Sequence, residues 1–265
     1  MSKNKKHEND KFYTKKNVVK KLISNLKLGV YDIIIEPSAG DGSFIDYIED
    51  YNYIAIDIQP ENNRIIKMDW FDFKLDKNYN KILVLGNPPF GNQGSLAMNF
   101  IKKCSDLKAY HIAFILPKSF KKESVKNRIP SNYHMILEIN IPDESFTLNN
   151  IDYSVPCIFQ IWERRDIIRE KIKLPTKTKY FDFVKKQDKP DISFRRVGFY
   201  AGHIYDNTSD KSDQSHYFIK SNGYMSLIDI KSILKSIKWE HDNTSGPRSI
   251  GKGELIIEFE KKVIN

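Results

Sequence analysis

Short apolar runs alternate with amphipathic segments along the first part of the chain. Each run is a few residues long and rich in isoleucine, valine and leucine, which is typical of strands buried on both faces. Because strands that alternate with helices form βαβ units, the pattern predicts an α/β fold with a mostly parallel, Rossmann-like sheet of seven strands. The expected strands are residues 31–37, 51–58, 63–69, 80–89, 110–117, 134–142 and 154–163.

Helices are expected between these strands. Val18, Val19 and Leu22 recur at helical spacing in residues 14–26, and Thr14 is expected to be the N-cap of that helix. Too few residues separate the last two strands for a crossover helix, so these strands are expected to pair antiparallel at an edge of the sheet. The other expected helices of this part are residues 41–51, 95–105 and 119–129.

The character of the chain changes after Trp162, where charge and proline content rise. We therefore expect residues 11–165 to form the main domain and residues 166–265 a small C-terminal extension, with residues 1–10 as a disordered basic tail. Within the extension, the pattern predicts a charged connector over 163–191, a polar loop over 207–222, an amphipathic helix over 225–239 and a closing helix within 246–263.

Composition supports a folded protein with a basic surface. Of the 265 residues, 40% are hydrophobic and 12% aromatic, enough for a core. Lys and Arg number 43 against 34 Asp and Glu, and the sequence pI is about 9.2. The surplus favours polyanionic partners, nucleic acid above all, although a composition rich in lysine and isoleucine also arises in AT-rich genomes.

Cysteine and histidine usage argues against a metal site. Cys104 and Cys157 lie far apart in apolar surroundings and are expected to be buried free thiols, and no Cys and His cluster has zinc-ligand spacing. The start of the chain is charged, which excludes a signal peptide there, and no apolar run is long enough to span a membrane. We expect no metal, no membrane and a cytoplasmic protein, or one of the nucleoplasm or host cytoplasm if viral.

A glycine loop follows the first strand in the stretch EPSAGDGSF, residues 36–44. Gly40 and Gly42 allow a sharp turn and a close approach to a ligand, and a helix N-terminus is expected behind them. Glu36 and Asp41 would repel a dinucleotide pyrophosphate but attract a cofactor with a sulfonium and an ammonium group. A plain turn is the alternative explanation of the two glycines.

Carboxylates also end the second and third strands. Asp57 is placed to accept both hydroxyls of a ribose, as acidic residues do in nucleotide-binding sheets. Asp69 is placed to accept an adenine N–H, with Trp70 or Phe71 against the ring. A turn carboxylate and a helix N-cap are the structural alternatives for these two acids.

The fourth strand ends in Asn-Pro-Pro-Phe, residues 87–90. Ligands bind at the carboxyl edge of open α/β sheets, and prolines fix the backbone there while removing N–H donors. The Asn87 amide oxygen and the Pro88 carbonyl form a pair of acceptors suited to an NH₂ group, and Phe90 offers a flat apolar face. The motif predicts a site that positions a planar aromatic amine for methyl transfer without a strong base.

These stretches resemble class I S-adenosylmethionine-dependent methyltransferases that methylate amino groups. The NPPF form is typical of N6-adenine enzymes, and KFYTKKNVVKKL is similar to their upstream cap motif, with Lys15 in place of the usual proline. The motif order is similar to that of the gamma class of DNA adenine methyltransferases. Phage, bacterial and giant-virus adenine-specific methylases are similar to the chain in the stretches GNPPFGNQGSLAMNFI, AFILPKSFKKESVKNRI, VPCIFQIWE and SIGKGEL. The main resemblance covers Lys11 to about Glu163.

The resemblance implies a seven-stranded methyltransferase sheet with an antiparallel last strand, S-adenosylmethionine as cofactor and N6 of adenine as the methylated atom. Cofactor contacts are then expected from Phe12, Tyr13, Thr14, Glu36, Ser38, Gly40, Asp57, Asp69, Trp70 and Asn87. The catalytic residues that hold the target base are expected to be Asn87, Pro88, Pro89 and Phe90.

Basic residues follow the fifth strand and recur in the C-terminal lobe, where phosphate contacts are expected. They are Lys118, Lys121, Lys122, Lys126 and Arg128, with Arg195 and Arg196 in the lobe. A solvated lysine face and the core of the lobe are the structural alternatives.

DNA is the first expectation for the substrate, with methylation of the restriction-modification kind. Because the lobe is short for sequence-specific DNA recognition, adenosine in ribosomal or cap-proximal RNA is an alternative. A protein glutamine methyltransferase and a non-catalytic binding subunit remain further alternatives.

Overall fold

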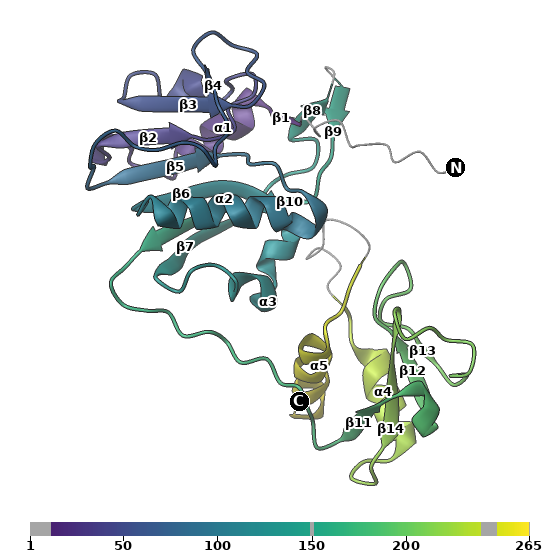
Figure 1. Ribbon diagram of the computed structural model, residues 1–265. Coiled ribbons are helices and arrows are strands. Elements are labelled where there is room, and N and C mark those ends of the chain that lie inside the picture. Colours follow the sequence, from purple (N-terminus) through teal and green to yellow (C-terminus); the bar gives the residue numbers. More distant parts are fainter. Residues whose placement is uncertain (1–11, 149–150, 240–247, 265) are drawn as a thin grey trace. The chain divides into compact units, whose positions relative to one another are not determined.

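The computed structural model describes residues 12–148, 151–239 and 248–264, which divide into two compact units (Figure 1). One unit runs to Lys171 and the other starts at Ile172. The basic tail expected over residues 1–10 lies outside the described residues.

The first unit is built on a sheet of seven strands in the order β4-β3-β2-β5-β6-β10-β7. Neighbours from β4 to β6 are parallel, whereas β10 runs antiparallel to both β6 and β7. The expected Rossmann-like α/β fold and the antiparallel pairing of the last two strands are thus confirmed. The strands are β2 (Ile33–Glu36), β3 (Tyr53–Asp57), β4 (Ile66–Lys67), β5 (Ile82–Gly86), β6 (His111–Pro117), β7 (Tyr133–Asn140) and β10 (Cys157–Arg164).

The central strands are apolar because both of their faces are covered. In β2, Ile33 and Ile35 belong to one core cluster and Ile34 to another, as alternation along a strand requires. Helix α1 (Lys16–Ile23) adds Val19 to the second cluster, and α2 (Ser95–Asp106) adds Met98 to the first. Each fully buried isoleucine contributes roughly 1.5–3 kcal/mol. Both cysteines, Cys104 and Cys157, are buried and free, as expected.

Local structure departs from the expectations in two predicted helices. Residues 41–51 form only the 3-10 turn η2 (Ile45–Tyr47), since isoleucine and tyrosine are weak helix formers. Residues 119–129 form the 3-10 turn η4 (Lys118–Lys121) and the short helix α3 (Glu123–Lys126). Two further 3-10 turns, η1 (Leu28–Val30) and η3 (Asn92–Gly94), complete the short elements of this unit that precede β6.

A second small sheet in the same unit was not expected. It joins β1 (Tyr13–Thr14), β8 (Phe146–Leu148) and β9 (Ile151–Tyr153) in antiparallel order. Thr14 is therefore a buried strand residue and not the N-cap of α1, because α1 begins one residue later than expected for such a cap and Lys15 precedes it.

The second unit packs two helices on a four-stranded antiparallel sheet in the order β11-β14-β12-β13. The connector expected over 163–191 contains β11, and the loop expected over 207–222 contains β14, so both expectations are wrong there. β11 and β14 each bury large apolar residues in the core of this unit, such as Phe181 and Ile219. Its elements are β11 (Phe181–Val184), η5 (Lys186–Asp188), β12 (Ile192–Arg195), β13 (Ile204–Tyr205), β14 (His216–Ser221), α4 (Leu227–Ser236) and α5 (Lys252–Ile264).

Residues 12–148, 151–239 and 248–264 contain no helix of sufficient length and apolarity to cross a membrane. In that same part of the chain, no group of three or more His, Cys, Asp or Glu side chains is arranged to hold a metal ion.

Candidate cofactor and substrate site

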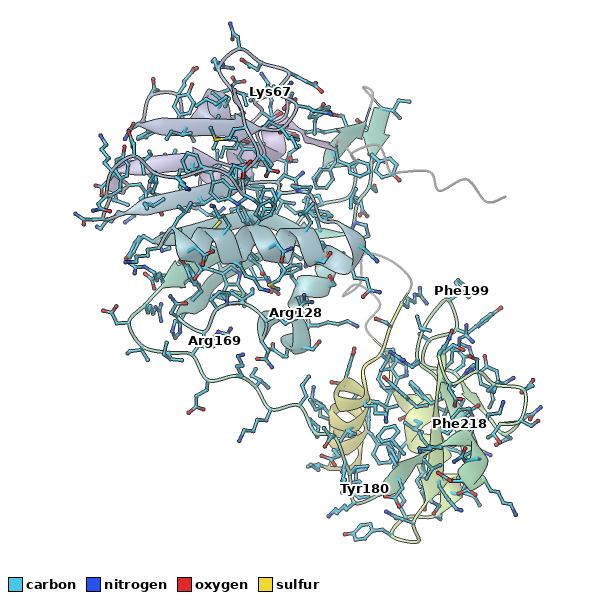
Figure 2. The ribbon with its side chains drawn as sticks, viewed as in Figure 1. Lys67, Arg128, Arg169, Tyr180, Phe199 and Phe218 are labelled. Atoms are coloured by element: carbon cyan, nitrogen blue, oxygen red, sulfur yellow. The ribbon has the colours of Figure 1, made fainter. Side chains whose placement is uncertain are left out.

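The carboxyl ends of β2, β3 and β5 meet at one edge of the large sheet, because these neighbouring strands are parallel. β4 continues that arrangement through its parallel pairing with β3, and Lys67 at its end is labelled in Figure 2. The expected site residues follow these strands, and the N-terminal segment with β1 lies against them through the contacts of Asn87.

Asn87 is held at the end of β5 by the N-terminal segment. Its Nδ2 donates to the Phe12 carbonyl at 3.3 Å and to Thr14 Oγ1 at 3.4 Å. Its Oδ1 is buried and has no hydrogen-bond partner among the described residues. Ser38 Oγ donates to the backbone carbonyl of Asn87 at 3.2 Å, which links the loop after β2 to the same residue. The amide is thereby oriented as an acceptor for a ligand.

The N-terminal segment keeps its place through β8 and β9. Tyr13 pairs with Thr147, and the Phe12 ring stacks on Tyr153 with 4.8 Å between centroids. The Lys15 N–H donates to the Ser145 carbonyl at 3.0 Å, and Lys15 Nζ forms an ion pair with Asp152 Oδ1 at 2.7 Å. A proline at position 15 could make neither bond, so the departure from the family motif has a structural reason here.

The glycine loop and Asp57 are connected directly. The Gly40 N–H donates to Asp57 Oδ2 at 2.8 Å, and the Gln59 N–H donates to Oδ1 at 2.7 Å. Gly40 has φ of +52°, and a Cβ there would lie 3.1 Å from the Tyr13 ring, so the position requires glycine. Each Asp57 oxygen keeps a lone pair for ligand hydroxyls. The helix N-terminus expected behind this loop is absent, because only the turn η2 follows.

Glu36 is a buried carboxyl at the end of β2. It is 1% exposed, and its Oε2 has no partner among the described residues. Burial raises the pKa of Glu36 well above its ordinary value, and the carboxylates of Asp41 and Asp57 add to the effect. A cation bound beside Glu36 would reverse this balance and stabilise the ionised form.

The segment after β4 contains the three residues expected to contact the adenine ring, and they differ in their exposure. Asp69 Oδ1 accepts the Phe71 N–H at 2.9 Å. Trp70 is buried, and its ring stacks on Phe73 and Phe100, with centroids 5.5 and 6.2 Å away. Phe71 is 41% exposed. Trp70 is therefore a core side chain, and Phe71 is better placed for a bound ring.

The Asn-Pro-Pro-Phe turn is fixed by the start of α2. Pro88 is buried, Pro89 is exposed and Phe90 is half-buried against both core clusters. The Phe90 carbonyl accepts the N–H groups of Leu96 and Ala97 at 3.1 and 3.3 Å. The turn therefore presents one partly open aromatic ring next to Asn87.

The basic residues expected to contact nucleic acid are split between the two units. Lys118 and Lys121 lie on η4 at the carboxyl end of β6, with Lys122 directly after it. Lys126 Nζ lies 3.3 Å from Glu138, which gives it a structural partner, whereas Arg128 is exposed.

Arg169 was missed in the sequence. It donates to the carbonyls of Tyr133, Lys126 and Ile129 at 3.0–3.1 Å and so closes the end of α3 (Figure 2). Its basic character in a charged segment gave no signal of this role.

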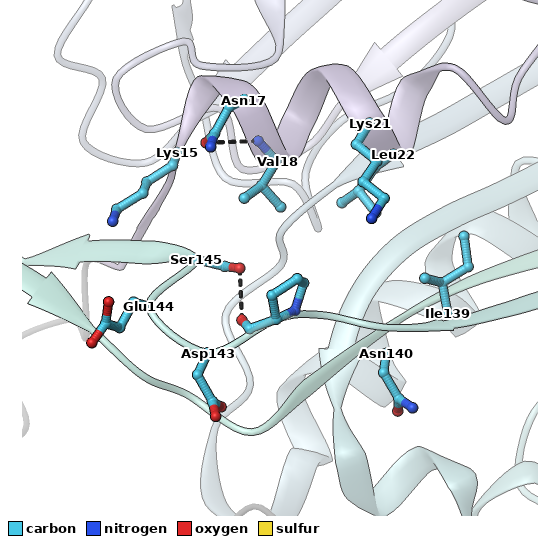
Figure 3. Close-up of a pocket in the computed structure, with 11 residues that line it drawn as sticks. Lys15, Asn17, Val18, Lys21, Leu22, Ile139, Asn140, Asp143, Glu144 and Ser145 are labelled. Atoms are coloured by element: carbon cyan, nitrogen blue, oxygen red, sulfur yellow. Dashed lines mark hydrogen bonds between the residues drawn. The ribbon is translucent and has the colours of Figure 1, made fainter.

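A cavity of about 360 Å³ lies between α1 and the segment from Ile139 to Ser145 (Figure 3). Its wall includes Lys15 and Lys21 but not Glu36, Gly40, Asp57 or Asn87. In it, Ser145 Oγ donates to the Pro142 carbonyl at 2.7 Å. The cavity is therefore separate from the residues assembled around Asn87.

Comparison with protein families gives one match. Residues 47–176 match the EDM2 methyltransferase-like domain. The match spans the sheet from η2 onward, including the Asn-Pro-Pro-Phe turn. Among curated proteins, no sequence matches the chain.

Many solved structures are similar to the chain, among them the following three. The 23S rRNA methyltransferase ErmE is 9% identical, with a TM-score of 0.45 over 62% of this chain and 72% of its own. PH1948 from Pyrococcus horikoshii, a candidate RNA methyltransferase, is 13% identical, with a TM-score of 0.45 over 61% and 90%. The N-methyltransferase NodS from Bradyrhizobium japonicum WM9, in complex with S-adenosyl-L-homocysteine, is 11% identical, with a TM-score of 0.40 over 57% and 86%.

At these identities and TM-scores, the structural neighbours decide nothing about the substrate. The family match and the donor set of the site together indicate S-adenosylmethionine as the cofactor. The buried Glu36 carboxyl fits the ammonium group of this cofactor, and the oriented Asp57 carboxylate fits its ribose. Gly40 lets the backbone come close to its methionine chain.

Proposed function

We propose that the chain transfers a methyl group from S-adenosylmethionine to the exocyclic N6 of adenine in nucleic acid, with DNA as the first candidate and RNA as the alternative. The observation that carries the proposal is the Asn87 amide. Its nitrogen is occupied by the N-terminal segment, and its oxygen is buried and unpaired among the described residues. A buried acceptor without a partner costs free energy, which a ligand N–H would recover.

The residues around the loop after β2 would hold the cofactor, which supplies an electrophilic methyl group on a sulfonium when bound. Glu36 would pair with its ammonium group, and Asp57 would accept its ribose hydroxyls. Asp69 would accept from the adenine amine, and Phe71 would cover the ring. Tyr13, packed over Gly40, would close the methionine end.

The Asn-Pro-Pro-Phe turn would hold the target base. Asn87 Oδ1 accepts one N–H of the amine, and the Pro88 carbonyl is proposed to accept the other. Both bonds keep the nitrogen lone pair out of conjugation and aim it at the methyl carbon. As the N–C bond forms, the bond from the methyl carbon to the sulfonium sulfur would break, and its electron pair would stay on sulfur as a neutral thioether. The alkylated nitrogen is then acidic and its proton passes to water, so positioning suffices and no strong base is required.

The cations that follow β6 support a nucleic-acid substrate. Lys118, Lys121 and Lys122 are half-buried and follow the carboxyl end of that strand, at the sheet edge that carries Asn87. Arg128 is exposed and follows α3. Phosphates would bind such a rim. A duplex adenine would have to be flipped out to reach the turn, whereas a single-stranded adenine would not.

A transfer assay tests the proposal. The purified chain is incubated with tritiated S-adenosylmethionine and, separately, with unmethylated genomic DNA, total RNA and a protein lysate. Labelled products are digested and identified by mass. N6-methyladenine from DNA is the expected product. Label in RNA would keep the chemistry and replace the substrate, while label in glutamine or no label at all would overturn the proposal.

A further inference from the structure

The second unit contains a basic and aromatic pocket of about 440 Å³. Phe183 and Tyr217 form an aromatic pair in its wall, with ring centroids 5.6 Å apart. Its lining cations are Arg196, Lys185, Lys186 and Lys252, and its lining acid is Asp213. Every lining residue belongs to this unit, so the pocket is a property of the unit alone.

The pocket lies where the apolar face of the small sheet ends. Register places Phe194 opposite Tyr217, and Arg196 is two residues further along the same face of the chain. Phe194 is buried in the core, whereas Tyr217 is only partly buried against it. Helix α5 starts at Lys252, and this first residue of the helix lines the pocket beside the apolar face of the sheet.

Two cations lie over the two rings. The Arg196 guanidinium carbon is 5.1 Å from the Tyr217 centroid. Lys252 Nζ is 4.9 Å from the Phe183 centroid and 5.6 Å from that of Tyr217. The rings therefore hold both charges at the pocket without neutralising them. Lys186 Nζ donates to the Lys211 carbonyl at 2.9 Å.

Arg196 and its neighbour Arg195 differ in how their head groups are used. Arg195 donates to the Val197 carbonyl at 2.7 Å and to Ser215 Oγ at 3.1 Å, so it is a structural residue of the lobe. Arg196 Nε is buried and has no hydrogen-bond partner among the described residues. A buried guanidinium N–H without an acceptor is costly, and an anion in the pocket would satisfy it.

We propose that this pocket binds a phosphate of a nucleic-acid strand, held by Arg196 and Lys252 and flanked by the Phe183–Tyr217 pair. The identity of the strand rests on the proposed function, because the pocket itself selects only the phosphate and an adjoining flat ring. Cations combined with aromatic rings are the usual groups for single-stranded nucleic acid, which offers a phosphate to the cations and a base to the rings. The C-terminal unit would then hold the substrate strand while the first unit modifies it.

Direct binding tests this proposal without methyl transfer. The full chain is titrated into fluorescently labelled single-stranded DNA and RNA oligonucleotides, and Kd is measured by anisotropy at several salt concentrations. Arg196→Met and Lys252→Met are compared with Lys235→Met, which removes an exposed charge of the same unit outside the pocket. Circular dichroism checks that each variant is folded. Lys252 is exposed, so its variant keeps the test valid if Arg196→Met does not fold.

The pocket variants are expected to raise Kd about tenfold and to lower the slope of log K against log salt by about one, with Lys235→Met close to the unchanged protein. Equal binding by the folded pocket variants and the unchanged chain would overturn the proposal, as would an equal loss in Lys235→Met. Competition by polyglutamate as strong as that by oligonucleotide would overturn it too. Methyl transfer to adenine with unaffected pocket variants would remove this inference alone, and pocket-dependent binding without transfer would remove the proposed function alone.

Discussion

At the scale of single residues, Asn87 shows how one side chain joins distant parts of the chain. Its side-chain amide nitrogen donates to the Phe12 carbonyl and to Thr14 Oγ1, and its backbone carbonyl accepts from Ser38 Oγ. Sequence reasoning could predict that the amide oxygen is an acceptor at the sheet edge. It could not predict what orients the amide, because that depends on a pairing between β1 and β8 that no local pattern reveals.

The change Asn87→Ala is expected to lower the methyl-transfer rate about 10²–10³-fold while cofactor binding is largely kept, since it removes an acceptor aimed at the target amine. Single-turnover kinetics and calorimetric titration with S-adenosylmethionine measure the two effects. The control is Asn99→Ala, which removes an exposed amide on α2. An unchanged rate in Asn87→Ala would contradict the assigned role.

Glu36 connects cofactor binding to pH. Because its pKa is raised by burial, the folded protein holds this proton to a higher pH than the unfolded chain, whose ordinary value is 4.5. The stabilisation from the bound proton is complete below that value and is lost as pH rises through the folded-state pKa. Binding of an ammonium group would favour the ionised form and release the proton.

Glu36→Gln is therefore expected to stabilise the free protein at pH 8 by about 1 kcal/mol, a shift of roughly 2–4 °C in Tm, with little change at pH 4. The same change is expected to weaken S-adenosylmethionine binding, because the amide offers no charge to the ammonium. Thermal melts at both pH values and calorimetry provide the measurements, with the exposed Glu170→Gln as control. Lower stability of Glu36→Gln at pH 8 would refute this account.

At the scale of elements, the buried Gln160 on β10 ties three segments together. Its Nε2 donates to Glu138 Oε2 at 2.8 Å and to the Phe120 carbonyl at 3.3 Å, and its Oε1 accepts from Trp162 Nε1 at 3.0 Å. This side chain thereby connects β10 with β7 and with the turn η4 that carries Lys118 and Lys121.

Gln160→Leu is expected to destabilise the fold by about 1–3 kcal/mol, because Trp162 Nε1 and the Phe120 carbonyl would lose a buried partner. Urea denaturation gives the free energy of unfolding. The matched change Asn140→Leu, at an exposed position of β7, is expected to stay within about 0.5 kcal/mol. Equal stabilities of the two variants would show that the Gln160 network contributes nothing.

Most strands of the large sheet could be predicted, because runs such as Ile33–Ile35 are buried on both faces and have a clear signal. The predictions failed where tertiary pairing overrides a weak local pattern. β14 lies in a polar stretch and is defined by its pairing with β11 and β12, and β1 is defined by its pairing with β8. The carboxylates of the site could be predicted from their place after strands, whereas the burial of Trp70 could not, because it depends on Phe73 and Phe100.

At the scale of the whole molecule, the two units have separate cores, since the apolar cluster of the second unit shares no residue with those of the first. The last residues of the first unit expose apolar side chains, with Ile167 at 75% and Ile168 at 64%. The sequence predicted the domain boundary at residue 165, and in the structure the first compact unit ends at Lys171.

Limited trypsin digestion is expected to cut early after Lys171 or Lys173. Both the N-terminal and the C-terminal fragment are expected to stay folded, because each unit has its own core. Mass spectrometry of the digest identifies the cut sites, and calorimetry of the uncut chain is expected to resolve two transitions. A single cooperative transition would mean that the units unfold as one.

The position of β10 has a consequence for how the protein is made. This strand, complete only at Arg164, lies between β6 and β7, which leave the ribosome before it. A growing chain therefore cannot finish the sheet by adding strands in order at its margin. Until Cys157–Arg164 emerges, the apolar β6 keeps an open edge, a template on which neighbouring nascent chains can pair. Slow translation just before residue 157 would prolong that hazard, and a chaperone that covers β6 would shorten it.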